Sequence, residues 1–398
     1  MLSYEEALEK ALSYTLFKRS EDLPPTHAIG KFLAEDVYTE HPLPYWDNSA
    51  MDGYAIRHED LNTYTDLTIV DEIPAGHQPQ IDINAGTCAR IFTGAPMPKG
   101  ADTVVIQENV NRKQHTITIH TPPNKGANVR KKGEELPLGA CIAKKGTQIR
   151  VGLVGLFQAL GITSVPVHHP PRIAIISTGD ELVERSKQQN LALGQIWSSN
   201  NHTLSAAIEN AGGIPIDCGI ARDNLEDTIL SFERALSHNP DLILSTGGVS
   251  VGDHDRVQEA LLQVGGKLDF WKVRLKPGKP LVLGNIQDIP FLGLPGNPVS
   301  ALVSFWLFVY PLIRQALGAK EIFLRSHTTT LSEDIYKRHS RAEFIRIKLS
   351  ADGRSAQKTG NQSSAWLSSV AHADALLHIP AAERGFAKGT SVSVLLLP

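Results

Sequence analysis

The sequence predicts a multidomain α/β protein, with a central doubly wound α/β domain and flanking β domains. Three observations predict this class. Apolar strands alternate with helix-like stretches from Arg172 onward, short strand-like pieces fill residues 62–135, and short strand-like pieces return after Leu317. The chain has 398 residues, which corresponds to two to four domains at roughly 100–200 residues each. Alternating strands and helices predict right-handed crossovers and a parallel sheet covered on both faces.

Composition and charge narrow the functional classes. Apolar residues make up 41% of the chain, charged residues 20%, and the formal net charge is −3. No overall positive field is available to recruit nucleic acid or an anionic membrane surface, so an anionic ligand must be held by local groups. The three scattered cysteines argue against a disulfide framework and favour a reducing, cytoplasmic compartment. The acidic, amphipathic N-terminus is unlike a signal peptide. The apolar run Val299–Ile313 is shorter than the roughly 20 residues of a membrane span and favours a buried core helix.

The first 135 residues begin with a helix and continue as β structure. Residues 3–17 are expected to be helical, with Ser3 and Glu6 as a capping box. Residues 41–54 are rich in proline, asparagine and glycine and are expected to be irregular. The expected strands of a small β module follow, and a polar, basic connector covers 121–135.

The α/β segment is expected to contain five strands and four helices. The expected strands are 172–178, 215–220, 242–244, 268–273 and 291–294. The expected helices are 200–212, 223–236 with Asp223 and Glu226 at its cap, 255–264, and a long apolar helix after residue 298.

Three of these strands end in turns of small residues. Open α/β sheets bind ligands beyond the carboxyl ends of their strands, where glycine permits close approach and helix N-termini favour anions. Although one such turn alone is more simply a tight turn, three converging turns predict a phosphate-bearing ligand. Neither a GxGxxG nor a P-loop fingerprint is present, which argues against an ordinary dehydrogenase or P-loop ATPase. The candidate contacts are Gly179, Gly247, Gly248, Ser250, Pro295, Gly296, Asn297, Pro298 and Ser300.

Charged residues accompany these turns. Lys276 and Lys279, in the loop KPGKP, suit a phosphate or a tetrahedral oxyanion. Nearby acids would repel such a ligand unless Mg²⁺ bridges carboxylates and phosphates. For Asp223, capping of the next helix is an equally weighted alternative to a functional role. The segment with Asp47 and Asp52 has the alternative of an inter-domain linker. For Thr93 the alternative is a hairpin turn. The acids near the turns are Asp180, Glu181, Asp223, Asp253 and Asp255.

Together these segments resemble the molybdopterin molybdenumtransferase family, which includes the gephyrin E domain. The resemblance spans nearly the whole chain, and DNSAMDGYA with LPGNPVS is its most specific part. Glu135, where aspartate is frequent, and Asp253-His254, where Glu-Ala is usual, are departures from the family pattern that leave Asp255 in place. The matching stretches are DNSAMDGYA (47–55), IFTGAPMPKGAD (91–102), GEE (133–135), STGDEL (177–182), STGGVSVGDHD (245–255), KPGKP (276–280), LPGNPVS (294–300), RAEFIR (341–346) and TGNQSSAWL (359–367).

The resemblance implies a four-domain homodimer that inserts molybdate into adenylyl-molybdopterin and releases AMP. The implied domains are an elongated dimerisation domain (1–46 with 136–170), a β lid (47–135), a molybdopterin-binding α/β domain (171–319) and a C-terminal β barrel (320–398). It implies catalytic roles for Asp52, Glu181 and Asp223, and Mg²⁺ ligands in Glu181, Asp223 and Asp255. The implied substrate contacts are the turn residues above together with Thr93, Lys276, Lys279, Arg341, Arg346 and Ser364.

Three alternatives stay open at this point. A scaffold role of the gephyrin E type is less favoured, because the sequence starts directly at its first helix, with no fused adenylylating domain. The adenylylating enzyme itself would need only the α/β segment, so the flanking β domains argue against it. A paralogue that inserts tungstate, or one that has lost activity, is equally compatible with the residues, because molybdate and tungstate are tetrahedral dianions of nearly equal size.

Overall fold

The computed structural model describes residues 1–16, 18–248 and 256–398. The chain divides into two compact units. Unit 1 comprises Met1–Ala34, Gly146–Arg150 and Pro166–Pro398, and unit 2 comprises Glu35–Lys145 and Val151–Val165. Each unit has hydrophobic clusters of its own.

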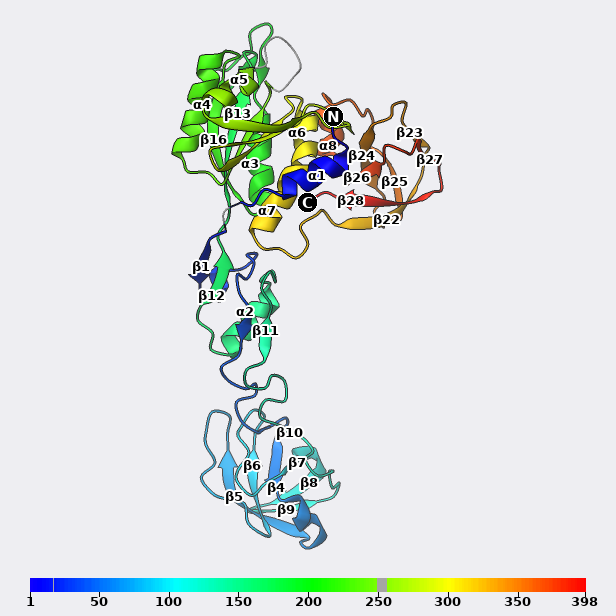
Figure 1. The fold of residues 1–398 in the computed structure, drawn as a ribbon. Helices are drawn as coiled ribbons and strands as arrows, with labels where there is room; N and C mark the ends of the chain where they lie inside the picture. Colours follow the sequence, from blue (N-terminus) through cyan, green and yellow to red (C-terminus); the bar gives the residue numbers. More distant parts are fainter. Residues whose placement is uncertain (17, 249–255) are drawn as a thin grey trace. The chain divides into compact units, whose positions relative to one another are not determined.

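Unit 1 contains a six-stranded sheet in the order β16-β13-β17-β21-β20-β18. Figure 1 labels its edge strand β16 and the neighbouring strand β13. The first four strands are parallel, as expected. The expectation of a wholly parallel sheet is wrong at β20, which is antiparallel to both of its neighbours. Two residues, Gln287 and Asp288, join β20 to β21, and a connection this short permits only a hairpin. The bounds are β13 Arg172–Thr178, β16 Ile214–Ala221, β17 Leu242–Thr246, β18 Gly266–Trp271, β20 Val282–Ile286 and β21 Ile289–Leu294.

Helices cover both faces of this sheet. Alternate residues of β13 face opposite sides, so Ile173 and Ile175 join one core cluster while Ala174 and Ile176 join another. The first cluster includes residues of α3 (Asn200–Ala211), α6 (Pro298–Ser304) and α7 (Tyr310–Ala316). The second includes residues of α4 (Leu225–Ser237) and α5 (Arg256–Gln263). The predicted doubly wound α/β architecture is therefore confirmed.

The apolar helix that runs over 298–316 belongs to this core. By length and composition it is the one helix among the described residues that can cross a membrane, but 78% of its apolar window is buried inside the protein. A five-residue π-helical turn, Phe305–Val309, joins α6 to α7. The expected core helix is confirmed.

The N-terminal helix α1 spans Tyr4–Leu12 and is shorter than expected. The predicted capping box is present, because the Ser3 hydroxyl accepts from the Glu6 N–H and the Glu6 carboxylate accepts from the Ser3 N–H. Ala7 and Ala11 are fully buried in the same cluster as the 298–316 helix. We expected this helix to share a domain with residues 136–170; it belongs to unit 1 together with residues 146–150 and 166–170 of that range.

The C-terminal strands of unit 1 close on themselves. The order is β19-β24-β25-β22-β28-β26, and a further pairing joins β26 to β24, so the last five strands form a ring. Strand β19 (Leu275–Lys276) pairs with β24 from outside this ring and carries the start of the KPGKP loop. The ring therefore contacts the loop that holds both candidate lysines. Its bounds are β22 Ser326–Leu331, β24 Ala342–Leu349, β25 Ser355–Lys358, β26 Ala375–Ile379 and β28 Ser391–Leu396.

Unit 2 contains a six-stranded sheet in the order β7-β4-β6-β5-β9-β8. Residues 41–54 are less irregular than expected. Strand β3 (Asn48–Ser49) pairs with β10 (Val129–Arg130), and β4 begins at Gly53. The bounds are β4 Gly53–Ile56, β5 Asp66–Ile73, β6 Thr87–Ile91, β7 Thr103–Ile106, β8 Val110–Lys113 and β9 Thr116–Ile119, with β2 Val37–Tyr38, β11 Cys141–Ala143 and helix α2 Val151–Ala159.

The remaining elements are short. They are β1 Ser20–Leu23, β12 Val165–His168, β14 Leu182–Val183, β15 Ile196–Trp197, β23 Ile335–Tyr336, β27 Gly385–Phe386, helix α8 Leu367–Ala371 and the 3₁₀ turns Pro25–His27, His58–Asn62 and Gln107–Asn109.

Candidate functional site

The three small-residue turns lie at one edge of the unit 1 sheet. Strands β13, β17 and β21 are parallel, with Ser177 opposite Thr246 and Thr246 opposite Leu294. The next residues of each strand therefore leave the sheet side by side. This is the carboxyl edge, where open α/β sheets bind ligands.

Hydrogen bonds join these turns to one another. The Gly247 N–H donates to the Leu294 carbonyl at 3.3 Å, and the Thr246 hydroxyl donates to the Pro295 carbonyl at 3.0 Å. The side-chain amide of Asn200 donates to the Thr246 hydroxyl and to the Gly296 carbonyl, both at 2.8 Å. Asn200 was missed by the sequence analysis; as the first residue of α3, its position at the strand edge was the available signal. The turns after β17 and β21 thus form one bonded surface.

Close packing explains the glycine at position 247. Its φ is +91°, and a Cβ there would lie 2.5 Å from the Thr178 carbonyl oxygen. Gly248 also has a positive φ, +61°, and a Cβ there would lie 2.8 Å from the Thr178 hydroxyl. Only glycine allows the turn after β17 to lie this close to the turn after β13.

The first turn of α6 gives this edge a helix N-terminus. Asn297 occupies the cap position without a side-chain cap bond, and Pro298 is the first helical residue. Gly296 and Asn297 are exposed, whereas Ser300 is only 4% exposed. Unbonded N–H groups at such a position favour an anion.

Two acidic residues meet at the same edge. The Asp223 N–H donates to an Asp180 carboxylate oxygen at 3.2 Å, and the Gly179 N–H donates to the Ala221 carbonyl at 3.2 Å. The expectation that Asp223 caps α4 is wrong, because the cap is Asn224, whose side chain accepts from the Asp227 N–H at 2.9 Å. Asp223 comes one residue too early for that bond, and its carboxylate is exposed.

The lysine loop follows β18 at this edge. The Lys276 ammonium lies 2.8 Å from a carboxylate oxygen of Glu343, a residue that the sequence analysis did not single out. Lys279 is exposed. The Arg341 guanidinium donates to the Leu275 carbonyl at 3.1 Å and so holds the start of the loop.

Arg346 supports a loop, whereas we expected it to be a ligand contact. It is 1% exposed, and its guanidinium donates to the Ser369 hydroxyl at 3.2 Å and to the Ser363 carbonyl at 3.1 Å. Burial lowers the pKa of Arg346 to about 10. Its bonds fix the segment that presents Ser364, which is half-buried.

In unit 2, Asp52 and Thr93 form a compact pair. One Asp52 carboxylate oxygen accepts from the Thr93 N–H and from its hydroxyl, both at 2.8 Å. These two bonds, with the nearby Arg90 guanidinium, lower the pKa of Asp52, and the backbone bond contributes most. Asp47 instead accepts from the Lys131 ammonium at 2.9 Å and the Lys132 N–H at 2.8 Å, which anchors the preceding segment.

Some expected site residues lie outside the described residues, namely Ser250, Asp253 and Asp255. Within the described residues no group of three or more histidine, cysteine, aspartate or glutamate side chains is arranged to hold a metal ion.

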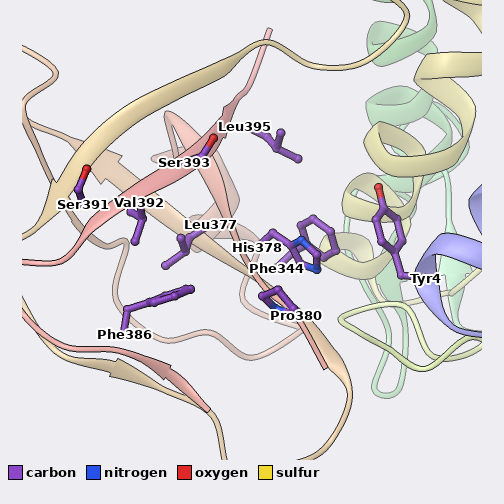
Figure 2. A pocket seen from close by; sticks show the side chains of 10 residues that line it. All are labelled: Tyr4, Phe344, Leu377, His378, Pro380, Phe386, Ser391, Val392, Ser393 and Leu395. Atoms are coloured by element: carbon purple, nitrogen blue, oxygen red, sulfur yellow. The ribbon is translucent and has the colours of Figure 1, made fainter. Parts of the chain in front are cut away.

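A separate pocket of about 480 Å³ lies between α1 and the C-terminal strands (Figure 2). His378 stacks on Phe344 with ring centroids 4.5 Å apart, and Tyr4 of α1 meets His378 edge-on. Burial lowers the pKa of His378. The lining is mainly apolar and aromatic and contains neither lysine nor arginine, so it differs in chemistry from the sheet edge.

Comparisons with known proteins cover nearly the whole chain. Residues 2–161 match the family model "MoeA N-terminal region (domain I and II)", 174–315 match "Probable molybdopterin binding domain", and 328–397 match "MoeA C-terminal region (domain IV)". A molybdopterin molybdenumtransferase of Nostoc sp. is 39% identical over 93% of this chain and 87% of its own length. The Haemophilus influenzae molybdopterin molybdenumtransferase is 36% identical over 87% and 85%.

Solved structures agree with these sequence matches. The crystal structure of the molybdopterin biosynthesis MoeA protein from Pyrococcus horikoshii is similar with a TM-score of 0.87 and 32% identity, and the match covers 100% of both chains. Family models, curated relatives and solved structures therefore agree on one family. The chain belongs to the MoeA family of molybdopterin molybdenumtransferases.

Proposed function

We propose that this protein is a molybdopterin molybdotransferase that inserts molybdate into adenylyl-molybdopterin and releases AMP. The observation that carries the proposal is the bonded set of turns at the sheet edge, with a helix N-terminus and two lysines beside it. Such a surface suits a phosphoanhydride next to a tetrahedral oxyanion. Family membership supports the same reaction.

The contribution of the protein in this mechanism is position and charge. The α6 N-terminus and the glycine turns bind phosphate oxygens through backbone N–H groups. Lys276 and Lys279 offset the charge of molybdate, and Arg341 and Ser364 complete that contact. Asp52 is the proposed catalytic group of unit 2, and its lowered pKa favours the ionised carboxylate beyond the ordinary tendency of an aspartate. In such transfers, most of the rate enhancement comes from holding the two reactants in line and from stabilising the charge that develops.

The acids at the sheet edge fit a magnesium ion. Their carboxylates are hard oxygen donors, and Mg²⁺ is usually held by one or two carboxylates together with substrate phosphates and water. Glu181 and Asp223 would hold it, together with Asp255 from the segment outside the described residues. When bound, the magnesium ion would neutralise part of the negative charge of the phosphates.

We further propose that the protein acts as a cytoplasmic homodimer, without nucleic acid or a membrane. Helix α2 supports a protein partner, because most of its side chains are apolar while Phe157 alone is fully buried. Val151, at its start, is 75% exposed. Sedimentation equilibrium tests the dimer, and a monomer at micromolar concentration would contradict it.

The decisive experiment is incubation with adenylyl-molybdopterin and Mg²⁺, with and without molybdate, followed by chromatographic measurement of AMP. We expect release that depends on molybdate. A parallel series with tungstate determines the metal preference. Absence of molybdate-dependent AMP in the wild type would rule out the proposed reaction.

Two substitutions test the proposed catalytic residues. Asp52→Ala and Glu181→Ala are each expected to lower molybdate-dependent AMP release at least about a hundredfold, the scale of losing one group that stabilises the reacting charges. The control is Asp288→Ala, because Asp288 is an exposed residue in the β20–β21 turn, at the opposite end of β21. Full activity in folded D52A and E181A proteins would remove these residues from the mechanism.

A further inference from the structure

Glu343 is a buried carboxylate at the base of the lysine loop. Its side chain is 6% exposed, and one of its oxygens lies 2.8 Å from the Lys276 ammonium. The Nε2 atom of His339 lies 3.2 Å from the other oxygen, without the alignment of a hydrogen bond. The pairing of β19 with β24 sets Lys276 directly opposite Glu343. Backbone register and side-chain contact therefore place the same two residues together.

The loop is also fixed on its other side. Gly278, between the two lysines, has φ +106°, and a Cβ there would lie 2.6 Å from the Ser304 hydroxyl of α6. Lys276 is held by Glu343, while the side chain of Lys279 is exposed and has no ion pair within the described residues. The two lysines of one loop therefore have different surroundings.

The Glu343 carboxylate is paired with Lys276 and also interacts electrostatically with Lys337 and Arg346. Lys337 is buried, and its ammonium donates to the carbonyls of Arg341 and Pro380. Burial lowers the pKa of His339 and outweighs the opposing effect of Glu343, so this imidazole is neutral at neutral pH. Because a buried charge is stable only with partners, Glu343 is suited to hold Lys276 charged and in place.

We infer that Glu343 is a positioning residue, which holds the Lys276 ammonium in place for the oxyanion while the exposed Lys279 supplies a second positive charge. The inference rests on the proposed function, because it assumes that Lys276 contacts molybdate or phosphate. A lysine side chain has about 2 kcal/mol of rotamer entropy, and fixing it before the ligand arrives reduces the cost of binding.

The first test is a double-mutant cycle on the Michaelis constant for molybdate in the AMP assay. Glu343→Ala is expected to raise KM roughly tenfold with little change in kcat, the scale of one hydrogen bond to a charged group. Glu343→Gln, which keeps an acceptor oxygen, restores KM to within about threefold of wild type. K276A/E343A behaves as K276A alone, whereas K279A/E343A shows the product of its two single effects.

The second test needs no substrate. Lys276 and Lys279 are labelled with an amine-acetylating reagent and quantified by mass spectrometry. Lys276 is expected to react more slowly than Lys279 in the wild type, and E343A is expected to accelerate Lys276 alone. Should E343A fail to fold, Glu343→Asp, which withdraws the carboxylate by one methylene, replaces it in both tests.

The outcomes separate the two proposals. A wild-type protein without molybdate-dependent AMP release contradicts the proposed function and leaves the labelling experiment as the test of Glu343. In an active protein, multiplicative effects of K276A and E343A would overturn the inference, as would failure of E343Q to restore KM. Equal labelling of both lysines in the wild type would overturn it as well.

Discussion

The Asp52–Thr93 pair concentrates two hydrogen bonds on one carboxylate oxygen in a β-rich unit. Each donor stabilises the ionised form, and the resulting lowered pKa keeps this carboxylate charged into mildly acidic conditions. The backbone donor is set by the turn after β6, while the hydroxyl donor depends on the residue type. The two contributions can therefore be separated by a single substitution.

Thr93→Val removes the hydroxyl donor and keeps the N–H. The pKa of Asp52 is expected to rise part of the way to its ordinary value. With a higher pKa, Asp52 of the variant takes up a proton at a higher pH than Asp52 of the wild type. As the pH falls, the variant is therefore expected to lose activity at a higher pH than the wild type does. The acidic limb of the pH–rate profile and the carboxyl ¹³C titration measure this shift. Thr116→Val, whose hydroxyl donates only to the Lys113 carbonyl, is the control, and an unchanged acidic limb in T93V would contradict the argument.

The turns at the carboxyl edge depend on one another because each packs against, or is hydrogen-bonded to, a neighbouring turn. The turn after β17 lies against the turn after β13 through Gly247 and is bonded to the turn after β21 through Thr246 and Asn200. A substitution in one turn therefore disturbs the others.

Gly247→Ala and Gly194→Ala form a matched pair that isolates close packing from backbone strain. Both glycines have positive φ, +91° and +88°, but a Cβ at Gly194 would meet nothing within 4 Å. In both variants an alanine must adopt a left-handed backbone conformation, which is expected to lower the free energy of unfolding by about 1–2 kcal/mol. G247A is expected to lose about 1–3 kcal/mol more from overpacking, measured by urea unfolding. Equal losses in the two variants would show that the contact with Thr178 is unimportant.

Local sequence signals predicted the elements and the turns of this edge. Strand β13 and the capping box of α1 follow from periodicity and capping within a few residues. The hairpin of β20 was missed because its turn, Gln287-Asp288, lacks a glycine or proline signal. The cap was placed at Asp223 instead of Asn224, since adjacent residues of similar chemistry differ only in backbone geometry.

Contacts between distant segments could not be predicted in the same way. The Lys276–Glu343 pair depends on the pairing of β19 with β24. The burial of Arg346 likewise depends on how the loop 359–369 folds over it. Neither arrangement leaves a local pattern in the sequence, so sequence reasoning identified the charged loops without their partners.

At the scale of the whole molecule, the described residues form one group of hydrophobic clusters around the sheet of unit 1 and another around the sheet of unit 2. The main cluster of unit 1 includes α1, the central sheet and part of the C-terminal ring. The clusters of unit 2 are formed by its own sheet, around residues such as Ile91. We therefore expect each group to have a free energy of unfolding of its own.

Differential scanning calorimetry tests this division. Ile91→Ala in unit 2 and Ile243→Ala in unit 1 each remove a fully buried side chain, and each is expected to cost about 2–5 kcal/mol. I91A lowers the temperature of one transition and I243A lowers that of the other. A single transition that both variants shift equally would contradict separate unfolding.

The packing of α1 has a consequence for how the protein is made. The Leu12 carbonyl accepts from the Gln315 amide, 303 positions later in the sequence. A nine-residue helix is too short to persist alone in water, and its partners are the 298–316 helix and Phe344. The α1 segment therefore stays without its binding surface until the 298–316 helix and Phe344 have been synthesised. A chain that is terminated early would keep the apolar face of this segment uncovered and open to chaperones and proteases.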